Sequence, residues 1–287
     1  MAGRELETGM TLQAPAPSPN AAAGSSFYAG MRILPRPERE AMFAVYGFCR
    51  QVDDIADDVE GKRPDRRRDL DAWRRDLDAL YAGRDPGRAI ALEGPVGRYG
   101  LRQPDFLAVI DGMQMDVDED IRGPELTKLD LYCDRVASAV GRLSVRIFGM
   151  DEAPGLTLAH HLGRALQLTN ILRDIDEDAG MGRLYLPREL LEAAGLAGLA
   201  PDAAIADPRV DGVCRELAGL ARRHYGEAEL VMASRPAGRM ATPRLMGAVY
   251  SRILDRTERQ GWAPPRRRQR LGKGELAWLV LRRGLLG

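Results

Sequence analysis

The chain has 287 residues, of which 45% are hydrophobic and 29% are charged, and its formal net charge is zero. This length and composition are ordinary for a soluble globular protein with a substantial core, in one large domain or two smaller ones. The even balance of charge argues against bulk nucleic-acid binding, which requires a basic surplus.

The first 24 residues are rich in Ala, Pro, Gly and Ser and contain no continuous apolar segment. Such a segment is neither a signal peptide nor a membrane anchor. We therefore expect residues 1–24 to form a disordered tail.

The first predicted helix begins near Pro37 and ends in a group of aspartates. Its polar residues recur at spacings of four, three and four, so they share one face: Tyr46, Arg50, Asp53 and Asp57. Like charges at i and i+4 on a helix are unfavourable, and a bound divalent cation is the usual resolution, with Mg²⁺ favoured by hard oxygen ligands. A solvated acidic face is the alternative.

The next segments are predicted to be helical but give weaker chemical signals. Helices are expected over residues 66–81 and 88–99, and a third begins at Pro104 and ends in the acidic run 116–120, which we interpret as a solvated helix end. A long, mostly apolar helix follows over residues 126–148. Its small residues near position 140 would permit close helix packing or make room for a bulky ligand.

A second acidic helix is predicted from about Leu156 to Asp178. Its polar residues recur at spacings of three, four and four: Gln167, Asn170, Asp174 and Asp178. Two such helices that face each other could hold a Mg²⁺ cluster between them, and that cluster would bind a diphosphate. The paired pattern is far more specific than either helix alone.

The remainder of the chain predicts a loop over residues 195–208, helices over 211–232 and 244–260, and a final basic and apolar segment. The apolar run 276–281 is far shorter than the ~20 residues that a membrane-spanning helix needs. A last core helix is the favoured interpretation of this segment, and a membrane-surface contact that combines it with the basic run 266–270 is the alternative. No segment alternates as a β-strand would, so the predicted fold is all-α.

The cysteines are far apart in apolar helical patterns: Cys49, Cys133 and Cys214. We expect buried thiols in a reducing compartment rather than disulfides or a metal site. His160 and His161 are adjacent and should point to different faces, and His224 is alone in the sequence. We assign the three histidines no chemistry.

Residues 49–57 (CRQVDDIAD) and 170–178 (NILRDIDED) resemble the two aspartate-rich signatures of the squalene/phytoene synthase family. The resemblance runs from about Ser25 to about Tyr250 and includes Ser25 to Tyr28, Tyr132-Cys133 and Tyr185 to Pro187. It implies a class I isoprenoid synthase helical bundle around a central apolar cavity, formed by residues 25–287 as a single domain.

The resemblance implies an enzyme that joins two prenyl diphosphates head to head with two or three Mg²⁺ ions. Within Tyr132 to Ala137, Arg135 stands where squalene synthases and carotenoid enzymes usually place a tyrosine implicated in catalysis. This feature resembles the bacterial subfamily that stops at presqualene diphosphate, in squalene and hopanoid biosynthesis. Two molecules of farnesyl diphosphate would then be the substrates, and no NADPH is expected. The string Gly272 to Ala277 fits G-x-G-x-x-A, but it does not follow a strand, so we interpret it as coincidence.

The resemblance also implies a cytoplasmic location. Contact with the inner face of the membrane and with a downstream pathway enzyme is left open. Squalene, dehydrosqualene or phytoene synthase activity on the same fold is the main alternative function, and a non-catalytic assembly factor is a remote one.

The site residues fall into three groups. The expected metal ligands are Asp53, Asp57, Asn170, Asp174 and Asp178. The catalytic group comprises Asp53, Asp57, Asp174, Asp178 and Arg135. The expected substrate contacts are Ser25, Ser26, Phe27, Tyr46, Arg50, Tyr132, Gln167, Asn170, Arg173, Tyr250 and Lys273. Purely structural roles remain open for the two serines, for Tyr250 and for Lys273.

Overall fold

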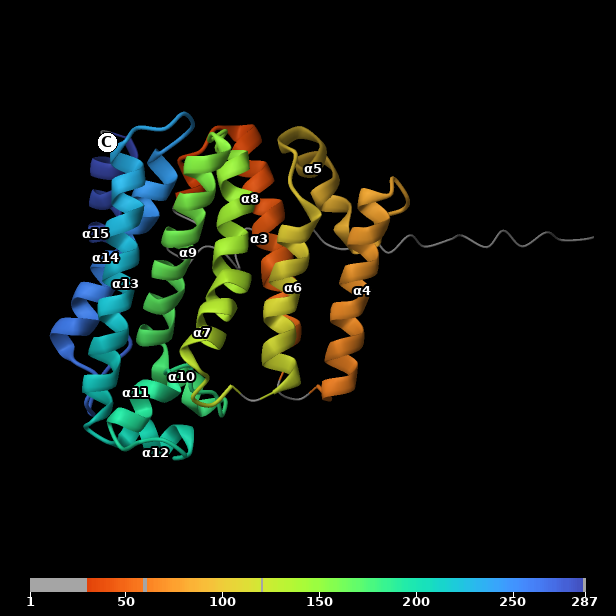
Figure 1. Ribbon diagram of the computed structural model, residues 1–287. Helices are drawn as coiled ribbons and strands as arrows, with labels where there is room; N and C mark the ends of the chain where they lie inside the picture. Colours follow the sequence, from red (N-terminus) through yellow and green to blue (C-terminus); the bar gives the residue numbers. More distant parts are fainter. Residues whose placement is uncertain (1–29, 59–60, 120, 286–287) are drawn as a thin grey trace, which may run out of the picture.

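The computed structural model describes residues 30–58, 61–119 and 121–285 (Figure 1). Within these ranges no strand occurs, and one isolated bridge joins Arg122 to Leu184. The predicted all-α fold is therefore confirmed. The predicted tail, residues 1–24, and the predicted contacts Ser25, Ser26 and Phe27 lie outside the described residues.

The first half of the chain forms helices close to the predicted ranges. They are α3 (Arg36–Asp57), α4 (Arg63–Tyr81), a 3₁₀ turn (Gly87–Leu92), α5 (Glu93–Tyr99) and α6 (Gln103–Asp118). A proline lies in the first turn of α3, α4 and α6, where its missing N–H is not needed.

The second half differs from the prediction at three places. It contains α7 (Leu126–Cys133), a π-helical turn (Asp134–Ser138), α8 (Ala139–Ile147), α9 (Glu152–Arg173), α10 (Ile175–Gly180), α11 (Arg188–Ala193), α12 (Pro201–Ala206), α13 (Val210–Ala233), α14 (Ala241–Gln260), α15 (Lys273–Leu279) and a final π-helical segment (Val280–Leu285).

Two of the differences have a local reason in the sequence. The predicted loop 195–208 contains α12, because Pro201 starts a helix and alanines continue it. The predicted helix 126–148 contains the π-helical turn. The predicted acidic helix breaks at Asp174, which has φ −103° and ψ 14°. Aspartate is a poor residue for a helix interior because its short side chain seeks other bonds, and here it binds two arginines.

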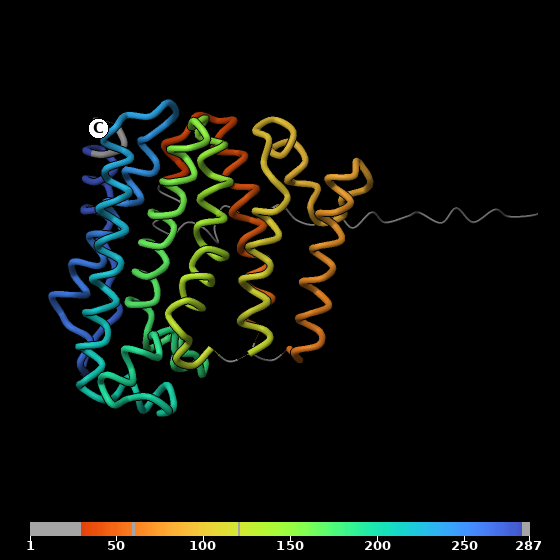
Figure 2. Tube along the Cα trace, viewed as in Figure 1, coloured from red at the N-terminus to blue at the C-terminus, as the bar shows by residue number. Residues whose placement is uncertain are grey.

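Two hydrophobic clusters form the core. One, built largely on α3, α4 and α6, contains Phe48 in edge-to-face contact with Trp73 and Phe106, at ring-centroid distances of 5.3 and 5.2 Å. The other is built largely on α9, α13 and α14 and includes Trp262, whose Nε1 donates to the Leu172 carbonyl at 2.8 Å. The helices of both clusters run side by side along the bundle (Figure 2).

Glycines allow α9 to lie close to the π-helical turn and α8. A Cβ atom at Gly163 would lie 2.7 Å from the backbone of Ser138, and one at Gly141 would lie 3.1 Å from the Cα of Ala159. The close packing predicted for the small residues is thus confirmed at Gly141, and the alternative also applies, because Ala137 and Gly141 line the cavity described below.

The C-terminal ends of α3, α6 and α9 lie at the same end of the bundle (Figure 1). Helix C-termini have a partial negative charge, because their last carbonyls lack intrahelical partners. The fold therefore brings the two aspartate-rich segments together at an end that already favours cations.

Candidate active site

A cavity of about 360 Å³ lies between the two hydrophobic clusters. Its volume is within the range of small-molecule sites, roughly 300–1,000 Å³. Much of its wall is apolar and includes Met42, Val45, Met113, Leu158, Leu162 and Met246. The predicted site residues that line it are Tyr46, Arg50, Asp53, Tyr132, Gln167, Asn170 and Tyr250. The cavity thus joins one apolar wall to polar residues of both aspartate-rich segments.

The first aspartate-rich segment is held by Arg50. Its Nη1 donates to Asp53 at 2.6 Å and its Nη2 donates to Asp54 at 2.6 Å. Burial and, second, the neighbouring charge of Asp57 raise the pKa of Asp53 to about 6, although Arg50 opposes the shift. The Asp53 carboxylate therefore lacks sufficient positive charge around it.

The second segment contains two carboxylates in different surroundings: Asp174 is paired with arginines, whereas Asp178 lies near other carboxylates. Asp174 accepts from Arg173 Nε at 2.7 Å and Nη2 at 2.5 Å, and from Arg268 Nε at 2.7 Å. Burial by itself would raise the pKa of Asp174, but these bonds outweigh it and hold the pKa below its ordinary value. Burial and the charge of Asp174 raise the pKa of Asp178 to about 7, although Arg183 opposes the shift.

A third helix adds Asp116, which the sequence interpretation missed. The prediction of a solvated acidic end is wrong for this residue, because Asp116 is buried and accepts from Tyr132 Oη at 2.9 Å and Tyr185 Oη at 2.7 Å. Its charge contributes to the raised pKa values of both Asp53 and Asp178. Its position three residues after Met113, on the buried stripe of the helix, was the available signal.

Arg183 is the buried cation of this acidic cluster. Its Nη1 donates to Asp57 Oδ1 at 2.7 Å, and its Nη2 donates to the Ala56 carbonyl at 3.0 Å. It thereby ties the end of α3 to the turn after α10. Residue 183 fell within the family resemblance, but the sequence indicated no role for it.

Several observations fit a divalent cation bound among these residues. The Oδ1 atom of Asn170 is buried and has no hydrogen-bond partner, which calls for a bound group. Burial first and neighbouring carboxylates second raise the pKa values of Asp53 and Asp178, and a bound cation would stabilise both carboxylates in their charged form. All candidate donors are oxygens, which Mg²⁺ prefers. Asp57 and Asp174 already bind arginines, but a carboxylate offers about four acceptor positions.

The remaining predicted residues lie in three different places. Arg173 lies within hydrogen-bonding reach of Tyr250, so it adjoins the cavity wall. Arg135 is half-buried in the π-helical turn and Lys273 is exposed at the start of α15; neither is among the residues that line the cavity. Their assigned roles stay predictions.

Comparison with known proteins agrees with this geometry. The squalene/phytoene synthase family model matches residues 20–275. A presqualene diphosphate synthase of Zymomonas mobilis is 58% identical over 265 residues, which cover 92% of this chain and 91% of that protein. One from Rhodopseudomonas palustris is 54% identical over 275 residues, covering 95% and 98%. The crystal structure of a dehydrosqualene synthase in complex with ligand has a TM-score of 0.76 at 27% identity and covers 90% of this chain and 89% of that chain.

Proposed function

This chain belongs to the squalene/phytoene synthase family, and we propose that it condenses two molecules of farnesyl diphosphate head to head, giving presqualene diphosphate and free diphosphate. The observation that carries the proposal is the 58% identity, over 92% of the chain, to a presqualene diphosphate synthase. The cavity supports it, because an apolar wall next to carboxylates suits a substrate with a long apolar chain and a diphosphate.

The reaction balances without an external reductant. The C1–O bond of one substrate breaks, and diphosphate leaves with the electron pair. The C2–C3 double bond of the second substrate attacks the C1 cation, and loss of a proton closes a cyclopropane ring. When bound, Mg²⁺ held by Asp53, Asp57, Asn170, Asp174 and Asp178 supplies the positive charge that stabilises the leaving diphosphate.

The residues of the chain orient the substrates and exclude water. Arg50 lines the cavity beside Asp53, so its guanidinium can contact departing phosphate oxygens. The apolar wall keeps water from the allylic cation. Burial raises the pKa of Tyr132 well above its ordinary value, so Tyr132 stays a neutral phenol. Its hydroxyl hydrogen is directed at Asp116, which fixes the ring at the cavity wall.

Arg135 does not itself line the cavity, but the next residues, Val136 and Ala137, do. We expect Arg135 to stop the reaction at presqualene diphosphate, because a cation that reached the product from this position would hold its diphosphate and oppose a second carbocation. Replacing this residue in Arg135→Tyr should let some product proceed to a hydrocarbon, detectable by mass spectrometry of the extracted lipids. A variant that still consumes farnesyl diphosphate but forms no hydrocarbon would count against this role.

The direct test is to incubate the purified protein with farnesyl diphosphate and Mg²⁺, with and without NADPH, and to identify the products by mass spectrometry. The expected result is a C30 product that retains one diphosphate, formed equally with and without NADPH and abolished by EDTA. A C30 hydrocarbon or alcohol would instead indicate a squalene or dehydrosqualene synthase. In a parallel incubation with the C20 substrate, geranylgeranyl diphosphate, a preference for that substrate would indicate a phytoene synthase.

We propose that the enzyme acts in the cytoplasm in squalene and hopanoid biosynthesis, touches the membrane at its inner face and passes its product to a downstream enzyme. None of the described helices is long and apolar enough to cross a membrane. Leu279 of α15 is buried, as the favoured interpretation of a core helix requires, whereas Trp278 and Leu281 are about half exposed, and such side chains can enter a membrane surface. Flotation with anionic vesicles should recover the protein but not a Trp278→Ser, Leu281→Ser variant; equal recovery of both would contradict the membrane contact.

A further inference from the structure

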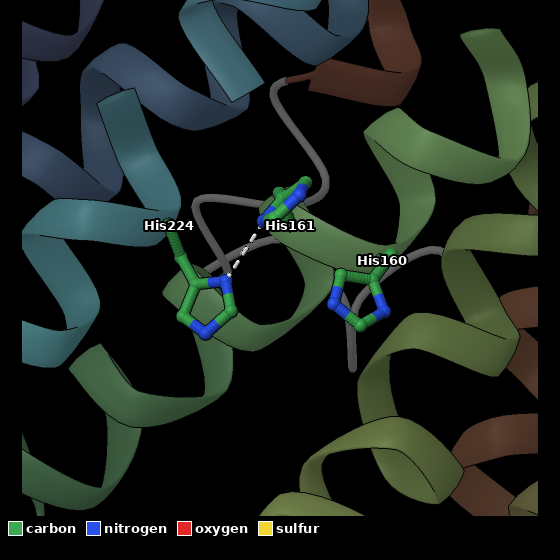
Figure 3. A group of neighbouring side chains, drawn as sticks. All are labelled: His160, His161 and His224. Carbon is green, nitrogen blue, oxygen red and sulfur yellow. Dashed lines mark hydrogen bonds between the residues drawn. The ribbon is translucent and has the colours of Figure 1, made fainter. Parts of the chain in front are cut away.

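The three histidines of the chain meet at one place on the bundle, although two are adjacent and the third lies 63 residues away (Figure 3). His160 and His161 project from α9, and His224 projects from α13. The sequence assigned the histidines no chemistry, because the spacing of residues along the chain does not reveal that α13 packs against α9. Adjacent residues on a helix differ in direction by about 100°, so both can flank the line along which a second helix packs. None of the three lines the cavity.

The separation of His161 and His224 is close to that of two ligands on one metal ion, and His160 lies nearby. The Nδ1 atoms of His161 and His224 are 3.0 Å apart, and one nitrogen from each of the three rings lies within 4.8 Å of the others. Two imidazole nitrogens bound to one ion at ~2.05 Å in tetrahedral geometry lie roughly 3.3 Å apart. A shift of a few tenths of an ångström would therefore accommodate an ion between His161 and His224.

The protonation of the rings also suits metal binding. Burial lowers the pKa of His224 to about 4, and the pKa of His160 also lies below its ordinary value. Both rings are neutral near pH 7 and have a lone pair to donate. The hydrogen bond between the Nδ1 atoms of His161 and His224 needs one proton between them. A metal ion bound to both Nδ1 atoms would instead accept a lone pair from each ring, and each ring would then have its proton on Nε2.

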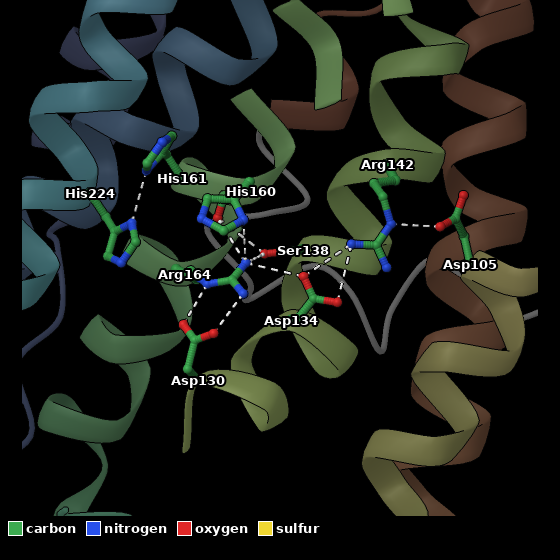
Figure 4. A network of polar contacts seen from close by, with 9 residues as sticks. All are labelled: Asp105, Asp130, Asp134, Ser138, Arg142, His160, His161, Arg164 and His224. Atoms are coloured by element: carbon green, nitrogen blue, oxygen red, sulfur yellow. Dashed lines mark hydrogen bonds and ion pairs between the residues drawn. The ribbon is translucent and has the colours of Figure 1, made fainter. Parts of the chain in front are cut away.

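A charged network supports His160 from behind (Figure 4). The Nδ1 atom of His160 accepts from Arg164 Nη1 at 2.9 Å, and the opposite edge of the ring is turned toward the other two histidines. Arg164 binds Asp130 at 2.7 and 2.9 Å and Asp134 at 3.1 Å.

The network continues beyond Asp134. Arg142 bridges Asp134 and Asp105, at 3.2 and 2.6 Å. Two guanidinium groups thus face three carboxylates. Besides burial, the positive charge of Arg164 nevertheless lowers the pKa of His160 and His224 and so disfavours an added cation, and Asp130 only partly offsets this effect.

The three rings are not equivalent as ligands. For His160 to bind through Nε2, its proton must move to Nδ1, and the bond from Arg164 must be given up. Arg164 Nη1 would retain Asp134 and Ser138 Oγ, the latter at 3.0 Å. In the pair His161 and His224, only the ring that now donates from Nδ1 must move its proton to Nε2, so these two form the stronger pair and His160 is the weakest ligand.

We propose that His160, His161 and His224 bind one transition-metal ion, Zn²⁺ by preference, which joins α9 to α13 outside the cavity. Imidazole nitrogens suit Zn²⁺, and three of them leave a fourth position for water. Because α9 also contains Gln167 and Asn170, the ion would stiffen the helix that lines one wall of the cavity. This site is separate from the oxygen-lined Mg²⁺ site and does not depend on the proposed reaction.

The test is calorimetric titration of Zn²⁺ into untagged, EDTA-dialysed protein in excess Mg²⁺, which occupies the aspartates. A histidine tag must be absent because it binds the same ions. We expect one Zn²⁺ per chain. Loss of a single ligand in His161→Gln or His224→Gln should weaken binding at least ~10-fold, since even loss of an indirect partner of a metal ligand costs ~10–100-fold. His160→Gln should weaken it less.

The matched control is Arg223→Gln, an exposed change next to His224 on the same helix, which should leave Zn²⁺ affinity unchanged. Zn²⁺ should raise the melting temperature of the wild type and this control but not of the double variant His161→Gln, His224→Gln. Equal Zn²⁺ affinity in wild type and double variant, or no binding to the wild type below millimolar concentration, would overturn the proposal. Mg²⁺-dependent product formation by the same samples reports separately on the proposed function.

Discussion

Replacing Arg183 with glutamine should destabilise the protein chiefly when Mg²⁺ is absent. The Arg183 side chain is 10% exposed and its partner Asp57 is 43% exposed. Removing one member of a fully buried ion pair costs about 3–5 kcal/mol of unfolding free energy. Because water can solvate Asp57 after the change, the part of the loss that comes from the unpaired Asp57 falls to about 1 kcal/mol. Asp116 and Asp178 also lose a nearby cation while they remain partly or fully buried. We expect a total loss of about 2 kcal/mol in the free energy of unfolding.

The backbone contributes little to this estimate. The Ala56 carbonyl loses Arg183 but keeps Arg66 Nη1 at 3.0 Å, so it retains a donor. Bound Mg²⁺ would neutralise the same carboxylates, so the deficit should shrink by more than half when Mg²⁺ is added.

Urea unfolding followed by circular dichroism, in EDTA and in Mg²⁺, measures both quantities. Arg188→Gln is the control, because Arg188 is 53% exposed and its contact with Glu125, at 3.4 Å, is a surface ion pair that contributes less than about 1 kcal/mol. A deficit for Arg183→Gln below about 1 kcal/mol in EDTA, or one of equal size in Mg²⁺, would refute the reasoning.

Three further predictions follow from the site and its packing. Asp178→Asn should lower the rate of product formation by about 100-fold or more without unfolding the protein, as assayed by mass spectrometry and circular dichroism; near-normal activity would exclude Asp178 from the metal site. The pKa of Asp178 is raised to about 7, so its stabilising contribution is complete below pH ~3.8 and is lost as the pH rises through about 7. In EDTA, the free energy of unfolding of Asp178→Asn should therefore rise, relative to that of the wild type, by about 1–2 kcal/mol between pH 5 and pH 8. A difference between the two proteins that does not change with pH would contradict this. Gly163→Ala places a Cβ 2.7 Å from the Ser138 backbone and should lower the free energy of unfolding by roughly 1–3 kcal/mol. The control Gly226→Ala, in open space on α13, should raise the free energy of unfolding by about 0.5–1 kcal/mol. Equal melting temperatures of the two variants would show that α9 can move aside.

Local pattern was sufficient to predict the long helices and the two aspartate faces. Buried residues such as Leu70, Trp73 and Leu77 recur at helical spacing, and each aspartate face depends on residues within about twelve positions of one another. Two of the failures were also local in origin. The break at Asp174 and the helix α12 are short features that a hydrophobic period does not resolve.

By itself, the sequence determined the all-α architecture and the paired aspartate segments, because helical periodicity depends on residues only three or four positions apart. Only the tertiary structure decided which distant groups share an environment. Arg183 reaches Asp57 across 126 positions, and Arg268 reaches Asp174 across 94. Asp116 joins both segments, and the histidines meet, because whole helices pack against one another. Such contacts leave no period in the sequence, since the intervening chain can have any length that lets the helices pack.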